Sequence, residues 1–312
     1  MTSYCIEQRK LIMKKVIILD GGMGRELKRI GAPFTQPLWS AQALIEAPHF
    51  VTQAHSGFID AGAEVITVNS YACVPFHLGE PLYDAQGAEL ANQAAIIAKK
   101  AAQSANKNIL VAGSLPPVFG SYRPELFERK RGFTILNTLY EAQNEYVDLW
   151  IGETISSIEE AQVMASVFKN SNKPCYYAFT LNDEVSELAT LRSGEFVTDA
   201  VTELLDHNVA GILFNCSIPE VIEQALIDTN KVLSKLNKTV ALGAFANGFT
   251  PIAHDYQANQ GSQAYRDISP SEYLGFAKKW HALGATVIGG CCGIGPEFIE
   301  VLVNWKQELE SA

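Results

Sequence analysis

Eight short apolar segments, each followed by a longer segment with helical periodicity, constrain the fold of this chain more than any other feature. Most run without the alternation of polar and apolar residues that marks a strand with one exposed face, so we expect strands covered on both faces. The pattern therefore predicts parallel strands with helices between them. The segments are residues 16–20, 64–69, 109–114, 147–153, 174–180, 210–216, 240–247 and 285–292.

Two of the intervening segments show the helical pattern most clearly. Residues 157–170 carry an apolar stripe from Ile158 to Phe168, and Glu159 and Glu160 stand in the first turn, where the helix dipole favours carboxylates. Residues 269–284 begin with a serine suited to capping and end with a glycine. Both segments are predicted to be helices that cover the strands.

Eight strand–helix units in 312 residues match a (β/α)8 TIM barrel, an α/β fold of about 250 residues. We expect one barrel domain over residues 15–312 and a peripheral N-terminal arm over residues 1–14, which lack clear periodicity. A doubly wound open sheet is the alternative. It usually has a Gly-x-Gly-x-x-Gly sequence after its first strand, but here the glycines stand at positions 21, 22 and 24.

Charge and composition limit the partners of the protein. The formal net charge is -10 and the basic residues are scattered, so the clustered footprint that a nucleic acid requires is missing. No apolar run has the length of a signal peptide or of a membrane span, and we therefore expect a cytoplasmic protein that does not bind membranes. In that compartment six cysteines indicate thiols or metal ligands in preference to disulfides.

Polar residues gather at the carboxyl ends of the predicted strands. In a TIM barrel those ends meet at one mouth, where active sites of this fold are built. The sequence therefore predicts one functional site that draws on most of the strands. The residues are Asp20, Asn69, Ser114, Glu153, Asn215 with Cys216, Asn247, and Cys291 with Cys292.

Three of the cysteines form a candidate metal site. Cys216 ends the sixth predicted strand, and Cys291 and Cys292 end the eighth, so the three thiols could meet at one rim. Three soft ligands and a free fourth position are typical of catalytic zinc, whereas structural zinc fills all four positions. The glycines around the adjacent pair allow the sharp bend that would turn both thiols to one ion.

The order of several motifs adds a resemblance. "DGGMGREL", "PLWSA", "AGAEVITVNSY", "ETISSIEEA", "FNCSIPE" and "GGCCGIGPE" together resemble the homocysteine S-methyltransferase family, from about Lys15 to Trp305. The resemblance implies transfer of a methyl group from an onium donor to the sulfur of homocysteine, giving methionine. It also implies Zn²⁺ on Cys216, Cys291 and Cys292, and binding of the substrate amine by Asp20 and Glu153.

Further site residues follow from the resemblance and from the strand ends. Asn69 and Ser70 stand where the family has polar residues that line the pocket, and Asn247 and Trp39 complete the predicted substrate-binding set. Aromatic rings suit an onium head, so Trp39, Tyr71 and Phe76 are candidates for the donor side. Ile294 and Gly295, where the family usually has a threonine, depart from its pattern without touching a proposed zinc ligand.

Several alternatives stay open at this point. The chain has no room for cobalamin- and folate-binding modules, so S-methylmethionine or S-adenosylmethionine is the preferred donor, with betaine as a further candidate. The acceptor could be selenocysteine or another small thiol instead of homocysteine. A non-catalytic zinc or redox switch is the competing class, although it would need no carboxylates at the strand ends. Residues 122–134 and 253–267 are candidate closing loops, and the oligomeric state is undetermined.

Overall fold

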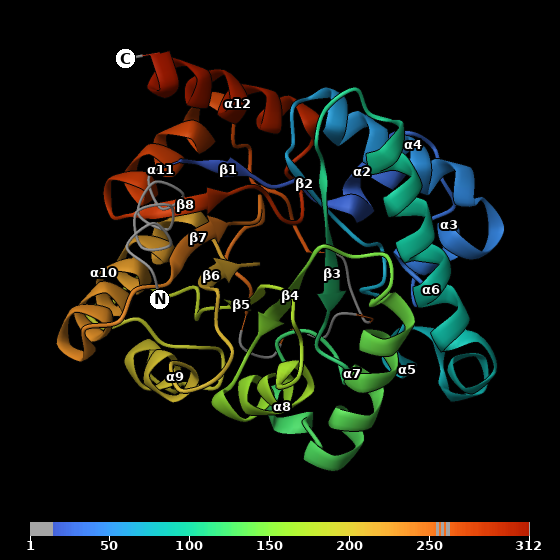
Figure 1. Ribbon diagram of the computed structural model, residues 1–312, viewed down its shortest axis with the longest axis horizontal. Coiled ribbons are helices and arrows are strands. Elements are labelled where there is room, and N and C mark those ends of the chain that lie inside the picture. The colour runs from blue at the N-terminus through green and yellow to red at the C-terminus, as the bar shows by residue number, and fades with distance from the viewer. Residues whose placement is uncertain (1–14, 254–255, 257–258, 260–262, 312) are drawn as a thin grey trace.

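The eight strands expected from the sequence form a parallel barrel in the computed structural model, which describes residues 15–253, 256, 259 and 263–311. Helices surround the barrel on the outside (Figure 1). The predicted (β/α)8 TIM barrel is therefore confirmed, whereas the N-terminal arm over residues 1–14 lies outside the described residues. The strands are β1 (Ile17–Ile18), β2 (Val65–Thr67), β3 (Leu110–Leu115), β4 (Leu149–Ile155), β5 (Cys175–Phe179), β6 (Gly211–Asn215), β7 (Ala241–Phe245) and β8 (Ala285–Ile288).

The strands follow one another around the barrel in sequence order, and the first and last close it. Strand β1 pairs with β8 through Ile17↔Val287 and Ile18↔Ile288. Between β1 and β2 the described contact is a single parallel bridge, Leu19↔Val65. Several strands are shorter than predicted because their last residues leave the ladder and form the mouth.

Two apolar layers hold the barrel together, as expected for strands covered on both faces. Residues that point inward form a cluster to which every strand or its immediate continuation contributes, for example Ala112, Leu213 and Val287. The alternate residues, such as Trp150 and Tyr177, pack outward against the helices. The barrel interior is therefore filled with side chains, and the predicted site residues lie at or just beyond the carboxyl ends of the strands.

The helices begin and end where the local sequence directs. The Ser157 hydroxyl caps α8 by accepting from the amide of Glu160, and Ser269 and Glu272 form a capping box at the start of α11. Both predicted helices are thus confirmed. The helices are α2 (Met23–Arg29), α3 (Ser40–Glu46), α4 (Pro48–Asp60), α5 (Pro75–Leu78), α6 (Glu80–Ser104), α7 (Arg129–Gln143), α8 (Ile158–Phe168), α9 (Val197–Leu204), α10 (Pro219–Leu236), α11 (Pro270–Ala282) and α12 (Pro296–Ser311).

One segment differs from its prediction. The candidate closing loop over residues 122–134 holds a short 3-10 helix (Pro124–Leu126) and the first turns of α7. The second candidate, residues 253–267, lies partly outside the described residues.

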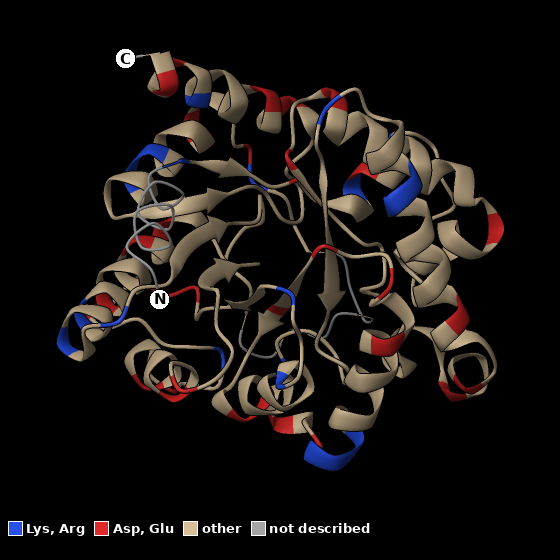
Figure 2. Ribbon diagram, in the orientation of Figure 1, with Lys and Arg blue, Asp and Glu red and all other residues tan. Residues whose placement is uncertain are grey.

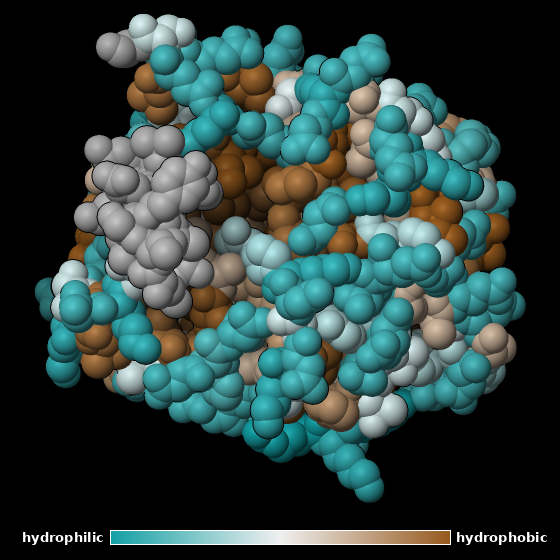
Figure 3. Space-filling view, viewed as in Figure 1, coloured by the Kyte–Doolittle hydropathy of each residue, from teal (hydrophilic) through white to brown (hydrophobic). Residues whose placement is uncertain are grey.

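Charged residues belong mainly to the helices and the connecting loops, whereas the strands contain few (Figure 2). On the face shown in Figure 3, hydrophilic residues cover most of the outer rim. Hydrophobic residues line the hollow near the centre. Among the described helices, none combines the length and hydrophobicity needed to cross a bilayer.

Candidate metal and substrate site

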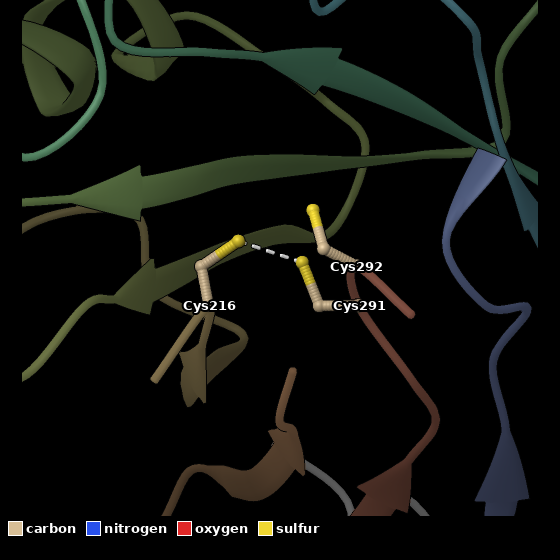
Figure 4. Close-up of side chains that lie close together, drawn as sticks. All are labelled: Cys216, Cys291 and Cys292. Carbon is tan, nitrogen blue, oxygen red and sulfur yellow. Dashed lines mark hydrogen bonds between the residues drawn. The ribbon is translucent and has the colours of Figure 1, made fainter. Parts of the chain in front are cut away.

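Three thiols converge at the carboxyl ends of β6 and β8. The sulfur atoms of Cys216, Cys291 and Cys292 all lie within 4.8 Å of one another (Figure 4). The sulfurs of Cys216 and Cys291 are 2.7 Å apart, and all three cysteines are free. The structure therefore brings together the three cysteines that the sequence singled out.

The loop that carries Cys291 and Cys292 is folded against the loop after β1. The amide of Gly290 donates to the carbonyl of Asp20 (3.0 Å), and the amide of Gly22 donates to the carbonyl of Ile294 (2.9 Å). A side chain at position 22 would stand 2.5 Å from the Cys291 carbonyl oxygen. The glycines after the first strand thus let its loop approach the thiol loop closely.

Cys216 adopts a backbone conformation that is unusual for a residue with a side chain. Its φ is +47°, and Thr154, which follows Glu153 in β4, has a φ of +59°. Asn215 joins the two segments, because its Oδ1 accepts from the Thr154 amide (2.9 Å) and its Nδ2 donates to the Thr154 hydroxyl (3.0 Å). This amide clamp fixes the thiol of β6 relative to the carboxylate of β4.

The thiols share their protons unequally. The pKa of Cys216 lies well below its ordinary value because Cys291 and Cys292 donate hydrogen bonds to its sulfur. The same bonds raise the pKa of Cys291 and of Cys292 well above the ordinary value. The three thiols therefore titrate as one coupled cluster.

Two buried carboxylates belong to the same mouth. Asp20 accepts from the amide (2.7 Å) and hydroxyl (3.0 Å) of Thr67, and burial raises its pKa to about 7 despite these bonds. Glu153 accepts from the Ser114 hydroxyl, and burial raises its pKa to about 8, with further contributions from the nearby charges of Cys216 and Asp20. Within the described structure the side-chain partners of both carboxylates, Thr67 and Ser114, are neutral. Their negative charge, once they ionise, is therefore available to a cationic group of a ligand.

The donor set fits a thiophilic metal ion. Among the described residues the clustered candidate ligands are three sulfurs, and this set favours zinc over magnesium or calcium, which prefer oxygen. The surrounding carboxylates add negative charge that a bound cation would offset. The residues present therefore suit the zinc ion that the sequence predicts.

The other predicted substrate residues lie around this centre with different partners. Asn69 donates to the carbonyl of Ser40 (3.3 Å), and the Ser70 hydroxyl donates to Gln143 Oε1 (3.1 Å) and to the Ser114 carbonyl (3.2 Å). Ser70 is fully buried, and its hydroxyl is already hydrogen-bonded to other residues of the protein. Its substrate-binding role stays a prediction.

Asn247 and Trp39 differ in how their polar groups are used. Asn247 is buried, its Oδ1 accepts from the Phe249 amide (3.1 Å), and its Nδ2 has no partner among the described residues. The Trp39 indole donates to Asn259 Oδ1 (2.7 Å), and Asn259 also donates to the Phe76 carbonyl (3.2 Å). Asn247 therefore offers a donor without a partner among the described residues, in a loop that bonds to the Cys292 carbonyl through Gly248, whereas Trp39 is tied to the segment after β7.

Two tyrosines, Tyr71 and Tyr122, lie in the loops that follow β2 and β3. The Tyr71 hydroxyl pairs with the Ser121 hydroxyl (2.6 Å), and the next residue, Tyr122, lies close enough to Cys216 to help lower the pKa of its thiol. Tyr122 has a φ of +66°, which is strained for a residue with a side chain. Sequence reasoning named Tyr71 but missed Tyr122, because nothing in its local sequence signals this conformation.

Comparison with known proteins places this arrangement in a family. A model of the family described as homocysteine S-methyltransferase matches residues 17–305. The chain belongs to the homocysteine S-methyltransferase family. The resemblance noted in the sequence is thereby confirmed, and the protein is a methyltransferase.

Relatives in this family span the same length as the chain. The selenocysteine methyltransferase of Astragalus bisulcatus is 27% identical over 91% of this chain and 90% of its own length. Homocysteine S-methyltransferase 4 of Zea mays is 26% identical over 94% of this chain and 90% of its own. The metallated form of the homocysteine methyltransferase MmuM from Escherichia coli superposes with a TM-score of 0.72 at 25% identity, covering 93% of this chain and 96% of that one.

Proposed function

We propose that this methyltransferase moves a methyl group from a small onium donor to the thiolate of homocysteine and forms methionine, with zinc held by Cys216, Cys291 and Cys292. The observation that carries the proposal is the meeting of three free thiols with two buried carboxylates at one barrel mouth, where the side-chain partners of the carboxylates among the described residues are neutral. Family membership favours this activity over the zinc or redox switch. The unpaired thiols are consistent with the expected cytoplasmic location.

The acceptor would be held at both of its ends. Asp20 and Glu153 would bind its ammonium group by charge-assisted hydrogen bonds, each carboxylate being oriented by Thr67 or Ser114. A zinc ion on the three cysteines would remove the proton of the incoming thiol and keep the sulfur as a nucleophile. The free Nδ2 of Asn247 would donate to a substrate oxygen.

The donor would carry its methyl group on a positive sulfur or nitrogen. When the thiolate attacks the methyl carbon, the new sulfur–carbon bond forms as the old bond breaks, and the donor leaves as a neutral molecule. Opposite charges are thus neutralised in the transition state, which a buried, water-poor site favours. Tyr71, Phe76 and Trp39 are the aromatic side chains proposed for the positive head.

A donor panel tests the proposal. Purified, zinc-loaded protein would be incubated with homocysteine and, in separate reactions, S-methylmethionine, S-adenosylmethionine or betaine, and methionine would be measured. We expect turnover with S-methylmethionine or S-adenosylmethionine. Absence of methionine with all three donors would refute the proposal.

Selenocysteine is the second candidate acceptor, because similar proteins from Astragalus bisulcatus and Brassica oleracea var. italica are selenocysteine methyltransferases. Its selenol would occupy the same position as the homocysteine thiol. Competition between the two acceptors at equal concentration, with both methylated products measured, decides which one is preferred. A preference for selenocysteine would change the acceptor and leave the proposed site in place.

A further inference from the structure

Three consecutive residues that begin with Cys216 are tied to the segment after β5. The Thr180 hydroxyl donates to the Cys216 carbonyl (3.2 Å), and the Leu181 amide donates to the Ser217 hydroxyl (2.8 Å). The Ile218 amide donates to Asp183 Oδ1 (3.0 Å). These bonds fix the backbone on the carboxyl side of Cys216, where its φ of +47° needs support.

Asp183 uses its second oxygen to reach another loop of the mouth. Asp183 Oδ2 accepts from the Ile252 amide (2.8 Å), which lies beyond β7, and from Arg192 Nη2 (2.7 Å). Arg192 Nη1 in turn donates to the Ile252 carbonyl (3.0 Å). The side chains of Asp183 and Arg192 are only 3% and 6% exposed, so the ion pair is screened from water.

Arg192 extends the same contacts to the loop after β3. Its guanidinium carbon lies 5.1 Å from the centre of the Tyr122 ring, and the Tyr122 side chain lies close to the Cys216 thiol. The pair thus touches Cys216 indirectly from two sides, through Ile218 and through Tyr122. Its contacts run to the loops that follow β3, β6 and β7, all of which belong to the mouth.

We propose that Asp183 and Arg192, together with the Thr180 hydroxyl, are positioning residues that hold Cys216 within reach of Cys291 and Cys292 and thereby set the metal affinity of the site. This inference rests on the proposed function, because it takes the three cysteines as the metal ligands. None of these residues needs to touch the ion or the substrates. A buried ion pair that only stabilised the fold would leave metal affinity unchanged in folded protein.

The test measures the zinc dissociation constant by competition with a chromophoric chelator, at a temperature where each protein is folded. Asp183→Asn keeps the size of the side chain and removes its charge. Thr180→Val removes the hydroxyl bonded to the Cys216 carbonyl and leaves the ion pair intact, so it decides the question if Asp183→Asn fails to fold. We expect either change to weaken zinc binding by roughly 10- to 100-fold, as is typical when the supports of metal ligands are lost.

Lys306→Met is the matched control. Lys306 is 9% exposed and pairs with Glu64 (2.6 Å) at the opposite end of the barrel, where Glu64 also accepts from the Ile18 amide (3.0 Å). This variant should lower the melting temperature and keep the zinc affinity of the unmodified protein. Zinc affinity within about threefold of the unmodified protein in folded Asp183→Asn and Thr180→Val would overturn the inference; failure of the unmodified protein to bind zinc would refute the proposed function instead.

Discussion

Asp20 and Glu153 are buried carboxylates whose side-chain partners in the described structure are the neutral residues Thr67 and Ser114. Burial raises their pKa values to about 7 and about 8, so each is largely uncharged at pH 6. An ammonium group needs them ionised. Binding of an amino acid should therefore strengthen as pH rises from 6 to 8 and should release protons.

We expect this pH dependence in the binding of methionine, the proposed product, whose thioether does not titrate. Glu153→Gln should weaken binding at pH 8 by roughly 10- to 100-fold, the equivalent of about 1.5–3 kcal/mol for a lost charge-assisted hydrogen bond. The remaining pH dependence should centre near 7, the pKa of Asp20. Calorimetric titration at several pH values measures both effects, and pH-independent binding by the unmodified protein would contradict the assignment.

Cys291→Ala should abolish both zinc binding and methyl transfer, because two thiols cannot provide the proposed three ligands. Cys73→Ala is the control, since Cys73 is a fully buried free thiol whose pKa burial raises to about 12. We expect this control to keep its zinc. Metal analysis of the two purified variants measures the difference, and equal zinc content would argue against the cysteine cluster as the metal site.

At the level of single residues, the sequence identified those whose position alone signals a role. Cys216 and the adjacent pair end predicted strands, and the structure brings their sulfurs together. Tyr122 and Asp183 could not be found in this way, because their roles depend on contacts with residues far away in the chain. Strand-end position marks where a side chain lies but does not reveal what holds it there.

The clamp between β4 and β6 is the element-level feature that links the two halves of the site. In Asn215→Ala the buried Thr154 amide loses its partner, which should cost about 1–3 kcal/mol of unfolding free energy. Because Thr154 adjoins Glu153 and Asn215 adjoins Cys216, kcat/KM for homocysteine should also fall. Thermal unfolding and steady-state kinetics measure the two effects.

Asn208→Ala is the matched control for the clamp. Asn208 also donates from its side-chain amide, to the carbonyls of Ser171 (3.1 Å) and Phe168 (3.4 Å), but it precedes β6 and lies at the other end of that strand. We expect it to lower stability while leaving kcat/KM unchanged. A similar loss of activity in both variants would show that the clamp acts only through stability.

The strands were predictable from the sequence because a strand that is buried on both faces needs a continuous run of apolar residues. All eight strands were placed, yet the run over 285–292 overestimated β8, which ends at Ile288. The last residues there turn toward the loop after β1 and bond to Asp20 and Ala246. The end of β8 thus depends on contacts with loops that are distant in the sequence, and a local sequence pattern cannot reveal such contacts.

For the whole molecule, bound zinc should stabilise the barrel because the ligands come from strands far apart in sequence and the unfolded chain cannot hold them together. When free zinc exceeds its dissociation constant about 1,000-fold, the stabilisation is roughly 4 kcal/mol. Chelation should therefore lower the melting temperature by several degrees. Differential scanning calorimetry measures the shift, and Cys292→Ala should show none.

Closure of the barrel by its first and last strands has a consequence for biosynthesis. Strand β1 finds its β8 partner 270 residues later, through Ile17↔Val287. At a translation rate of about 5–20 residues per second, the first strand leaves the ribosome roughly 15–50 s before that partner is made. A nascent chain would keep the β8-facing edge of β1 unpaired throughout this interval, and it would gain its complete thiol cluster only once Cys291 and Cys292 have been made.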